Sequence, residues 1–235
     1  MANKDSGGAG DMKKFYIILG VVAVAGIAAL ANSLMGVDAV AEPVDLGEMD
    51  NEALIELAQG MVYGDPNAPI TIMEFGDYQC PACGFFGTAV KPQIDLAYIE
   101  TGQAKLVFHD FPLEGHPHSF VAARAARCAG DQDQYFAYHD AIFRNQESWS
   151  PKPNAAGDFV EYAADLGLDE GEFRSCLESD RHSDVVSANK RLGELMGVNS
   201  TPTLLVHDGT PPAQRLGGFQ FVDIQQAIEA SNSND

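Results

Sequence analysis

Two cysteines one helical turn apart are the residues of this chain best placed to do chemistry. Cys80-Pro81-Ala82-Cys83 directly follows an apolar run at residues 70–75, so we expect a strand that turns into a helix at the first thiol. Unpaired N–H groups at a helix N-terminus favour the anionic form of a thiol placed there. Because thiolate is the form that attacks disulfides, the pattern predicts a redox disulfide with Cys80 as nucleophile and Cys83 as the buried, resolving thiol.

A Cys-x-x-Cys pair can also bind zinc, which normally requires two further Cys or His ligands at matching spacing. The chain has no second Cys-x-x-Cys, and His116 and His118 lie in a separate loop. The other histidines show no ligand spacing such as His-Glu-x-x-His. We therefore expect no metal site and no bound organic cofactor.

The two remaining cysteines are Cys128 and Cys176, and both lie in helical patterns. An even number of cysteines in an exported protein suggests disulfides, and the tight first pair leaves these two as the second pair. A bond between them would stabilise the fold by roughly 4 kcal/mol on the chain-entropy model. The alternative is a pair of buried free thiols.

The N-terminus is predicted to be a targeting segment, residues 1–37. Lys13 and Lys14 precede an apolar run at residues 15–31. This run is long for a signal-peptide core of roughly 7–15 residues and short for a membrane helix of about 20. We favour an uncleaved signal anchor over a cleaved signal peptide. Either one places the rest of the chain outside the cytoplasm, on the periplasmic side, because the positive charges stay inside.

Charge excludes one class of partner. The 235 residues include 34 acidic and 14 basic side chains, which gives a net charge of −20. Such an acidic chain argues against nucleic acid as a partner and indicates a solvated acidic surface. The length fits one large domain, or one domain with an insertion.

Apolar periodicity and turn residues predict the elements that must position the thiols. An acidic linker at residues 38–60 contains one short helix at 51–59, and a tail at 231–235 follows the last helix. Pro92 should kink the helix that begins at Cys80. Strands are expected at 61–63, 70–75, 104–109, 203–206 and 215–219, and helices at 80–100, 118–129, 132–146, 155–166, 169–178, 181–196 and 221–230. This order predicts an α/β, thioredoxin-like fold over residues 61–230, with a helical insertion at about 112–197.

Four motifs in the same order resemble the DsbA-like family of thiol–disulfide oxidoreductases, over about residues 61–230. The first and last motifs are the most specific. The motifs are residues 74–83 (EFGDYQCPAC), Phe111-Pro112-Leu113 with His116-Pro117, residues 125–129 (AARCA) and residues 198–203 (VNSTPT).

The resemblance implies roles for three further residues. Pro202 would be a cis proline against the active-site disulfide and, with Thr201, would bind the substrate chain. Glu74 would be a buried acid beneath the site that moves the proton of Cys83. The alternative for Glu74 is a strand residue that faces solvent or pairs with a lysine.

Two positions depart from the best-known DsbA proteins. Ala82 replaces a histidine that stabilises the thiolate in the strongly oxidising members, so we expect a weaker oxidant here. Thr201 replaces an apolar residue, and a threonine there also occurs in disulfide isomerases.

The predicted function is an exported enzyme that forms disulfides in unfolded or reduced exported proteins. The resemblance implies reoxidation by a membrane partner, either DsbB-like or a vitamin K epoxide reductase homologue, and we expect a monomer. Two alternatives remain. One is a disulfide isomerase or reductase, which Thr201 favours. The other is a copper-carrying or peptide-binding module that uses the same thiols.

Overall fold

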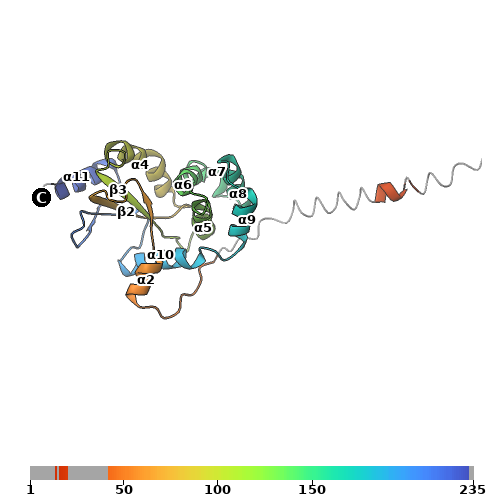
Figure 1. Ribbon diagram of the computed structural model, residues 1–235, viewed down its shortest axis with the longest axis horizontal. Coiled ribbons are helices and arrows are strands. Elements are labelled where there is room, and N and C mark those ends of the chain that lie inside the picture. The colour runs from red at the N-terminus through yellow and green to blue at the C-terminus, as the bar shows by residue number, and fades with distance from the viewer. Residues whose placement is uncertain (1–13, 15, 21–41, 233–235) are drawn as a thin grey trace, which may run out of the picture. The chain divides into compact units, whose positions relative to one another are not determined.

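The computed structural model describes residue 14, residues 16–20 and residues 42–232. The chain divides into two units, Met1–Asp38 and Ala39–Asp235, and the second carries the fold (Figure 1). In the first unit the described residues are helical. Most of the predicted targeting segment lies outside the described residues. Within the described ranges, no helix is both long enough and apolar enough to cross a membrane.

A mixed sheet forms the centre of the second unit. Its strands among the described residues are β1 (Met61–Tyr63), β2 (Ile70–Gly76), β3 (Ala104–Asp110), β4 (Thr203–His207) and β5 (Gln214–Arg215), in the order β1-β3-β2-β4-β5. β2 and β3 are parallel, and the other neighbours are antiparallel. β2 is central and almost wholly buried, which agrees with its mainly apolar sequence.

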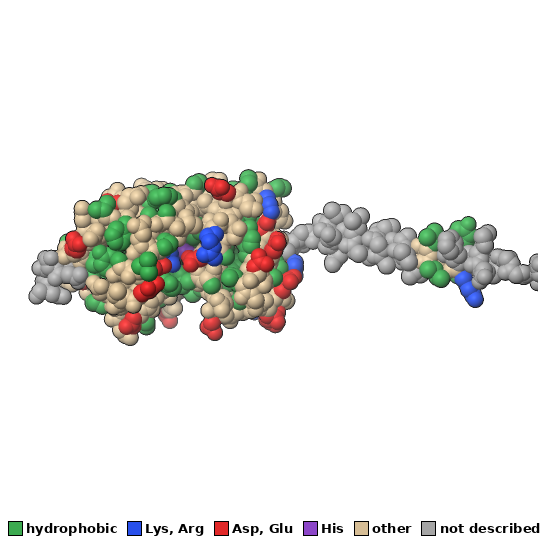
Figure 2. Space-filling model, turned by 90° about the horizontal axis from the view of Figure 1, so that it is seen from above, with side chains coloured by type: hydrophobic (Ala, Val, Ile, Leu, Met, Phe, Trp, Pro, Cys, Tyr) green, Lys and Arg blue, Asp and Glu red, His purple; other side chains and the backbone are tan. Residues whose placement is uncertain are grey.

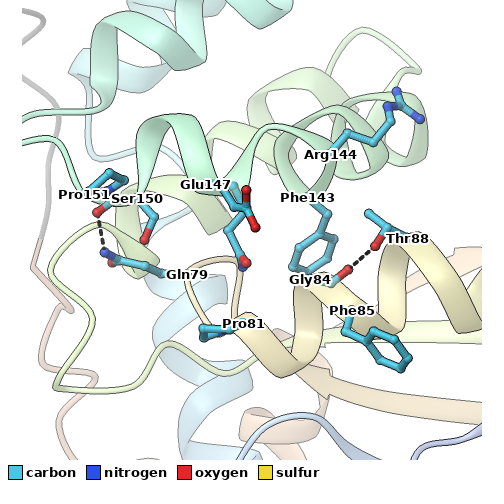
Figure 3. A pocket seen from close by; sticks show the side chains of 11 residues that line it. Gln79, Pro81, Gly84, Phe85, Thr88, Phe143, Arg144, Glu147, Ser150 and Pro151 are labelled. Carbon is cyan, nitrogen blue, oxygen red and sulfur yellow. Dashed lines mark hydrogen bonds between the residues drawn. The ribbon is translucent and has the colours of Figure 1, made fainter.

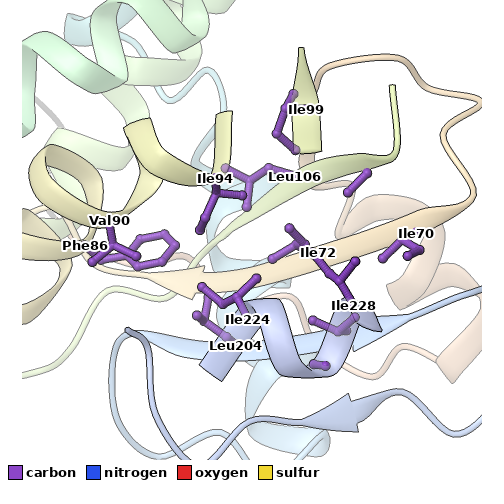
Figure 4. Packing of buried hydrophobic residues seen from close by; sticks show 13 residues of the cluster. Ile70, Ile72, Phe86, Val90, Ile94, Ile99, Leu106, Leu204, Ile224 and Ile228 are labelled. Atoms are coloured by element: carbon purple, nitrogen blue, oxygen red, sulfur yellow. The ribbon is translucent and has the colours of Figure 1, made fainter. Parts of the chain in front are cut away.

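One face of the sheet packs against the helical segment that begins at the cysteine pair, and against α11 (Phe221–Asn232). Ile72 of β2, Leu204 of β4 and Ile228 of α11 meet in this core (Figure 4). Side chains alternate along a strand, so Glu74 projects to the same face of β2 as Ile72. The strand thereby directs Glu74 toward the helix that carries the thiols.

That helical segment runs unbroken past Pro92. It consists of α3 (Pro81–Phe85), the π-helical turn η1 (Phe86–Val90), α4 (Lys91–Ile94) and a second π-helical turn η2 (Asp95–Ile99). Proline has no N–H for the carbonyl four residues before it. Here the Lys91 N–H donates to the Phe86 carbonyl five residues back, so the hydrogen bonding just before the proline is that of a π-helix.

The helical block lies between β3 and β4 in the chain. It comprises α5 (Ser119–Gly130), α6 (Tyr135–Arg144), α7 (Gln146–Trp149), α8 (Ala156–Asp165), α9 (Glu170–Glu178) and α10 (Ser183–Leu195). The helix predicted at 132–146 is divided, because Asn145 is non-helical between α6 and α7. α10 covers the second face of the sheet, where its Gly193 lies against Phe75 and Phe111.

The structure differs from the expected linker at residues 38–60. Helix α2 (Asn51–Leu57) is present, but Leu54 and Ala58 are buried against Ala188 of α10. The Val44 N–H also donates to the Ser187 hydroxyl. The described part of this segment is therefore packed onto the fold through Leu54, Leu57 and Ala58, whereas Ile55 on the other side of α2 is exposed.

The C-terminal elements differ from expectation in two places. β5 contains only Gln214 and Arg215, since Gly217 and Gly218 interrupt the strand predicted at 215–219. Of the expected tail, Ser231 and Asn232 belong to α11, and residues 233–235 lie outside the described residues.

The surface is acidic, as the composition requires. On the face seen in Figure 2, acidic side chains are scattered among apolar and uncharged ones, with a few basic groups between them.

Candidate active site

Cys80 is the N-cap residue of α3, and Pro81 occupies the first turn, where its missing N–H costs nothing. Both thiols are free, so the structure describes the dithiol form. Cys80 is 8% exposed and Cys83 is fully buried. The Cys83 sulfur accepts a hydrogen bond from the Asp77 N–H at 3.5 Å. The geometry therefore presents the first thiol and encloses the second.

The two thiols differ in acidity. The pKa of Cys80 is lowered from 9.0 to about 5, chiefly by a hydrogen bond from the Cys83 thiol. The side chain of Thr201 and the backbone N–H groups of Cys83 and Ala82 lower it further, whereas partial burial raises it. Burial raises the pKa of Cys83 well above its ordinary value, and the bond to Cys80 adds to the effect. At neutral pH, Cys80 is a thiolate and Cys83 is a thiol.

The segment Thr201–Pro202 lies against the first thiol. The peptide bond between these residues is cis, and the Cys80 sulfur lies 3.4 Å from the Thr201 carbonyl oxygen. The Thr201 hydroxyl is buried and has no hydrogen-bond partner in the described part of the chain. This hydroxyl is the side-chain group through which Thr201 lowers the pKa of Cys80.

Glu74 lies beneath the pair. Its side chain is 1% exposed, and neither carboxylate oxygen has a hydrogen-bond partner among the described residues. Burial raises the pKa of Glu74 to about 8. The positive charge of Lys91 lowers this pKa, and the negative charge of Cys80 raises it further. The solvent-facing alternative does not hold. Lys91 itself is ion-paired with Asp95 and does not bond to the Glu74 carboxylate, so the lysine-paired alternative does not hold either.

The loop before the nucleophile is held by the helical insertion. The Gln146 amide donates to the carbonyls of Tyr78 (2.7 Å) and Cys80 (2.9 Å). The Gln79 amide donates to the Ser150 carbonyl (Figure 3) and its oxygen accepts from the His118 N–H. These bonds join α7 and its neighbouring loop directly to the active-site loop.

Asp77 joins the same loop to the segment that follows β3. It is 1% exposed, and one carboxylate oxygen accepts from His116 (2.7 Å) and from the Leu113 N–H (2.9 Å). The other oxygen accepts from the Gln79 N–H at 2.7 Å. Asp77 therefore fixes the turn between β2 and α3, and its own carbonyl accepts from the Cys80 N–H at 3.1 Å.

A cavity of about 840 Å³ opens beside Cys80, between α3 and the α6–α7 region. Gln79 and Pro81, which flank Cys80, line it together with Phe85, Phe143 and Glu147 (Figure 3). The residues on either side of the nucleophile thus border a space that can admit a polypeptide side chain.

Several residues of the site were not predicted. Gln79 lies in the first motif and Gln146 in a predicted helix, but neither was assigned a role, because their partners are fixed only by the packing of the insertion. Arg215 was also missed; it donates to the Gly197 carbonyl and to the Thr203 hydroxyl, and so holds the segment around Pro202.

The second pair of cysteines lies in the helical insertion. Cys128 of α5 and Cys176 of α9 form a disulfide with a Cα–Cα distance of 5.9 Å. One turn earlier on α5, the buried Arg124 guanidinium donates to the carbonyls of Cys176, Leu177 and Ser179. These contacts fasten the end of α9 to α5.

Comparisons with known proteins agree with this arrangement. The family model described as thioredoxin matches residues 56–214. The chain belongs to the thioredoxin family. The crystal structure of oxidised BdbD from Bacillus subtilis superposes with a TM-score of 0.67 and 25% identity, covering 83% of this chain and 99% of that one. With DsbA structures also among the matches, the α/β thioredoxin-like fold and the DsbA-like resemblance are confirmed.

Two relatives differ in the share of their own length that this chain matches. Disulfide bond formation protein D of Bacillus subtilis (strain 168) is 27% identical over 152 residues, which cover 63% of this chain and 67% of that protein. Na(+)/H(+) antiporter NhaA 1 of Mycobacterium sp. (strain KMS) is 36% identical over 175 residues, 72% of this chain and 26% of the antiporter. The chain thus spans about a quarter of the length of such antiporters.

Proposed function

We propose that this protein is a thiol–disulfide oxidoreductase that forms disulfides in substrate proteins by exchange through Cys80 and Cys83. The observation that carries the proposal is the position of Cys80 at the start of α3, beside the fully buried thiol of Cys83. This arrangement lowers the pKa of Cys80 to about 5. A stable thiolate favours the reduced form of the pair, which makes its disulfide oxidising.

The exchange proceeds in two steps. In the oxidised protein a substrate thiolate attacks the Cys80 sulfur, forms a mixed disulfide, and releases the Cys83 sulfur with the electron pair of the broken bond. A second substrate thiolate then attacks the substrate sulfur of the mixed disulfide, and Cys80 leaves as a thiolate. The substrate loses two electrons, which the Cys80–Cys83 pair gains.

In the first step, Glu74 is proposed to supply a proton to Cys83. The buried Cys83 is stable only as a thiol, so it must gain a proton when it is released. A carboxyl with a pKa of about 8 is protonated at neutral pH and can supply that proton, directly or through one water. The proton returns to Glu74 when the pair is reoxidised.

The substrate chain is proposed to lie along Thr201 and Pro202. The Thr201 carbonyl lies at the Cys80 sulfur, so backbone groups of a bound extended chain would meet the protein next to the reacting atom. The oxidase direction is the main proposal. Isomerase or reductase activity is the alternative that the Thr201 hydroxyl favours.

The proposed setting is outside the cytoplasm. Residues 1–37 would export the chain and either anchor it or be cleaved, and the thioredoxin-like domain would begin near residue 61, with its helical insertion at about 112–197. The working form is proposed to be a monomer. A DsbB-like protein or a vitamin K epoxide reductase homologue in the membrane would reoxidise it.

Refolding of reduced ribonuclease tests the function. The oxidised protein should restore ribonuclease activity, and Cys80→Ser should abolish this, whereas Cys128→Ala/Cys176→Ala should retain it. Refolding activity that survives Cys80→Ser would exclude the mechanism. Stoichiometric copper in the reduced protein, without exchange activity, would favour the carrier instead.

A further inference from the structure

A second group of donor atoms lies far along the chain from the redox pair, where α5, α9 and the start of α10 meet. The sulfurs of Cys128 and Cys176 and a ring nitrogen of His182 all lie within 4.8 Å of one another. An Asp131 carboxylate oxygen lies 3.0 Å from His182 Nε2 and 3.7 Å from the Cys176 sulfur. Two sulfurs, an imidazole and a carboxylate therefore converge on one point.

His182 is held in this position by the backbone. It is the N-cap residue of α10 with φ of 66°, in the left-handed region that histidine seldom adopts. Its carbonyl accepts the Val186 N–H at 3.1 Å, and the next residue, Ser183, donates to the Asp180 carbonyl at 3.0 Å. The ring is thus directed at the disulfide by a fixed turn, although its side chain remains 22% exposed and accessible.

We propose that reduction of the Cys128–Cys176 disulfide creates a zinc site, with both thiolates and His182 as ligands and Asp131 as the fourth. In the oxidised protein the sulfurs bond to each other and cannot bind a metal. Tetrahedral zinc with bonds of about 2.3 Å to sulfur separates two sulfur ligands by roughly 3.8 Å. The sulfurs must therefore move apart on reduction, while the His182 nitrogen already lies within 4.8 Å of both of them.

Charge at the site is also suitable. Two thiolates and one carboxylate carry three negative charges, zinc supplies two positive ones, and the Arg181 guanidinium, 3.1 Å from Asp131, supplies the third. Soft sulfur and imidazole ligands select zinc over calcium or magnesium.

The reaction requires a dithiol reductant and balances with it. The protein disulfide, one dithiol and one Zn²⁺ give the zinc-bound bis-thiolate, the disulfide of the reductant and two protons. Two electrons pass from the dithiol to the Cys128–Cys176 bond, and the protons come from the dithiol. Because zinc binds only the reduced form, it makes this disulfide easier to reduce and replaces it as the link between α5 and α9.

Zinc titration of the reduced protein tests the proposal. The full chain would carry Cys80→Ser/Cys83→Ser, which removes the competing thiols, and would be reduced with a dithiol that is then removed without oxygen. We expect one Zn²⁺ per chain, and a cobalt(II) complex with the spectrum of tetrahedral thiolate coordination. His182→Ala should weaken zinc binding at least about tenfold. The matched control is His207→Ala, which removes a histidine at the end of β4 and should change nothing.

Three results would overturn the proposal. They are the absence of stoichiometric zinc, binding that is unchanged in both His182→Ala and Asp131→Ala, and a reduced chain whose circular dichroism shows no fold with or without zinc. The last result counts because an unfolded chain does not bring His182 to the sulfurs.

Discussion

The Cys80 sulfur lies 3.4 Å from the carbonyl oxygen of Thr201, across a separation of 121 residues. This contact joins the start of α3 to the segment before β4, and it brings to the nucleophile a residue whose buried hydroxyl has no partner among the described residues. After the hydrogen bond from Cys83, it is the side chain of Thr201, not this carbonyl, that helps to lower the pKa of Cys80. The residue type at this position departs from the best-known DsbA proteins.

Thr201→Val tests that dependence. Loss of the hydroxyl removes a donor to the thiolate, so the pKa of Cys80 should rise from about 5. A hydrogen bond to a charged group contributes about 1.5–3 kcal/mol, which corresponds to a pKa higher by roughly one to two. Thiolate absorbance in the ultraviolet, followed against pH, measures the change. Thr210→Val, at an exposed turn, is the control. An unchanged titration in Thr201→Val would show that the hydroxyl does not stabilise the thiolate.

Glu74→Gln tests the buried acid through stability. With a pKa raised to about 8, folded Glu74 holds its proton at pH values where the unfolded chain has released it. The folded state therefore loses stability as pH rises from about 4.5 to about 8, on the order of 1.4 kcal/mol for each pH unit between the folded and unfolded pKa values. Glutamine removes this cost. Urea unfolding of the two reduced proteins should show a gain for the variant that is larger at about pH 9 than at about pH 5. A gain in unfolding free energy that is the same at both pH values would show that folding does not raise the pKa of Glu74.

The residue between the cysteines sets the oxidising power. Ala82 cannot donate to the thiolate, so the reduction potential of the Cys80–Cys83 pair should lie below the value of about −120 mV of DsbA. Ala82→His should lower the pKa of Cys80 and raise the potential, by about 30 mV for each tenfold change in the equilibrium constant. Equilibration with glutathione measures the reduction potential of the pair in both proteins. A wild-type value near −120 mV would contradict the role given to position 82.

Prediction from sequence succeeded where the signal was local. The apolar run of β2, the proline at position 81 and the spacing of the two cysteines specify the strand, the helix start and the thiol pair without reference to the rest of the chain. Helices of the insertion follow from apolar spacing in the same way, and Asp169 caps α9 with a hydrogen bond from the Glu172 N–H.

The contacts that refine the site could not be predicted, because they depend on packing between distant segments. Gln146 lies 66 residues from Cys80 in the chain, and nothing in its surrounding sequence specifies two carbonyl partners in the active-site loop. The burial of Leu54 against α10 likewise depends on a surface formed by remote residues. The π-helical pairing at Pro92 is a third example, since the sequence indicates a disturbance there but not how the backbone resolves it.

The Cys128–Cys176 disulfide should contribute to stability and not to the chemistry. Its ends are 48 residues apart, so its removal by Cys128→Ala/Cys176→Ala should cost roughly 4 kcal/mol through the entropy of the unfolded chain. Urea unfolding of the oxidised proteins measures the loss, and the thiolate titration of Cys80 should stay the same in the variant. A loss below about 1 kcal/mol would mean that the contacts of Arg124 already hold α9 to α5.

The most direct test of Cys80 as the nucleophile is the trapping of its mixed disulfides. Cys83→Ala leaves an accessible thiolate and removes the thiol that resolves the intermediate. Incubated with a disulfide-containing substrate protein, this variant should accumulate a covalent complex that a reductant dissolves and that mass spectrometry assigns to Cys80. The matched variant Cys80→Ala, which keeps only the buried thiol, should form none. A complex formed equally well by Cys80→Ala, or none formed by Cys83→Ala, would contradict the mechanism.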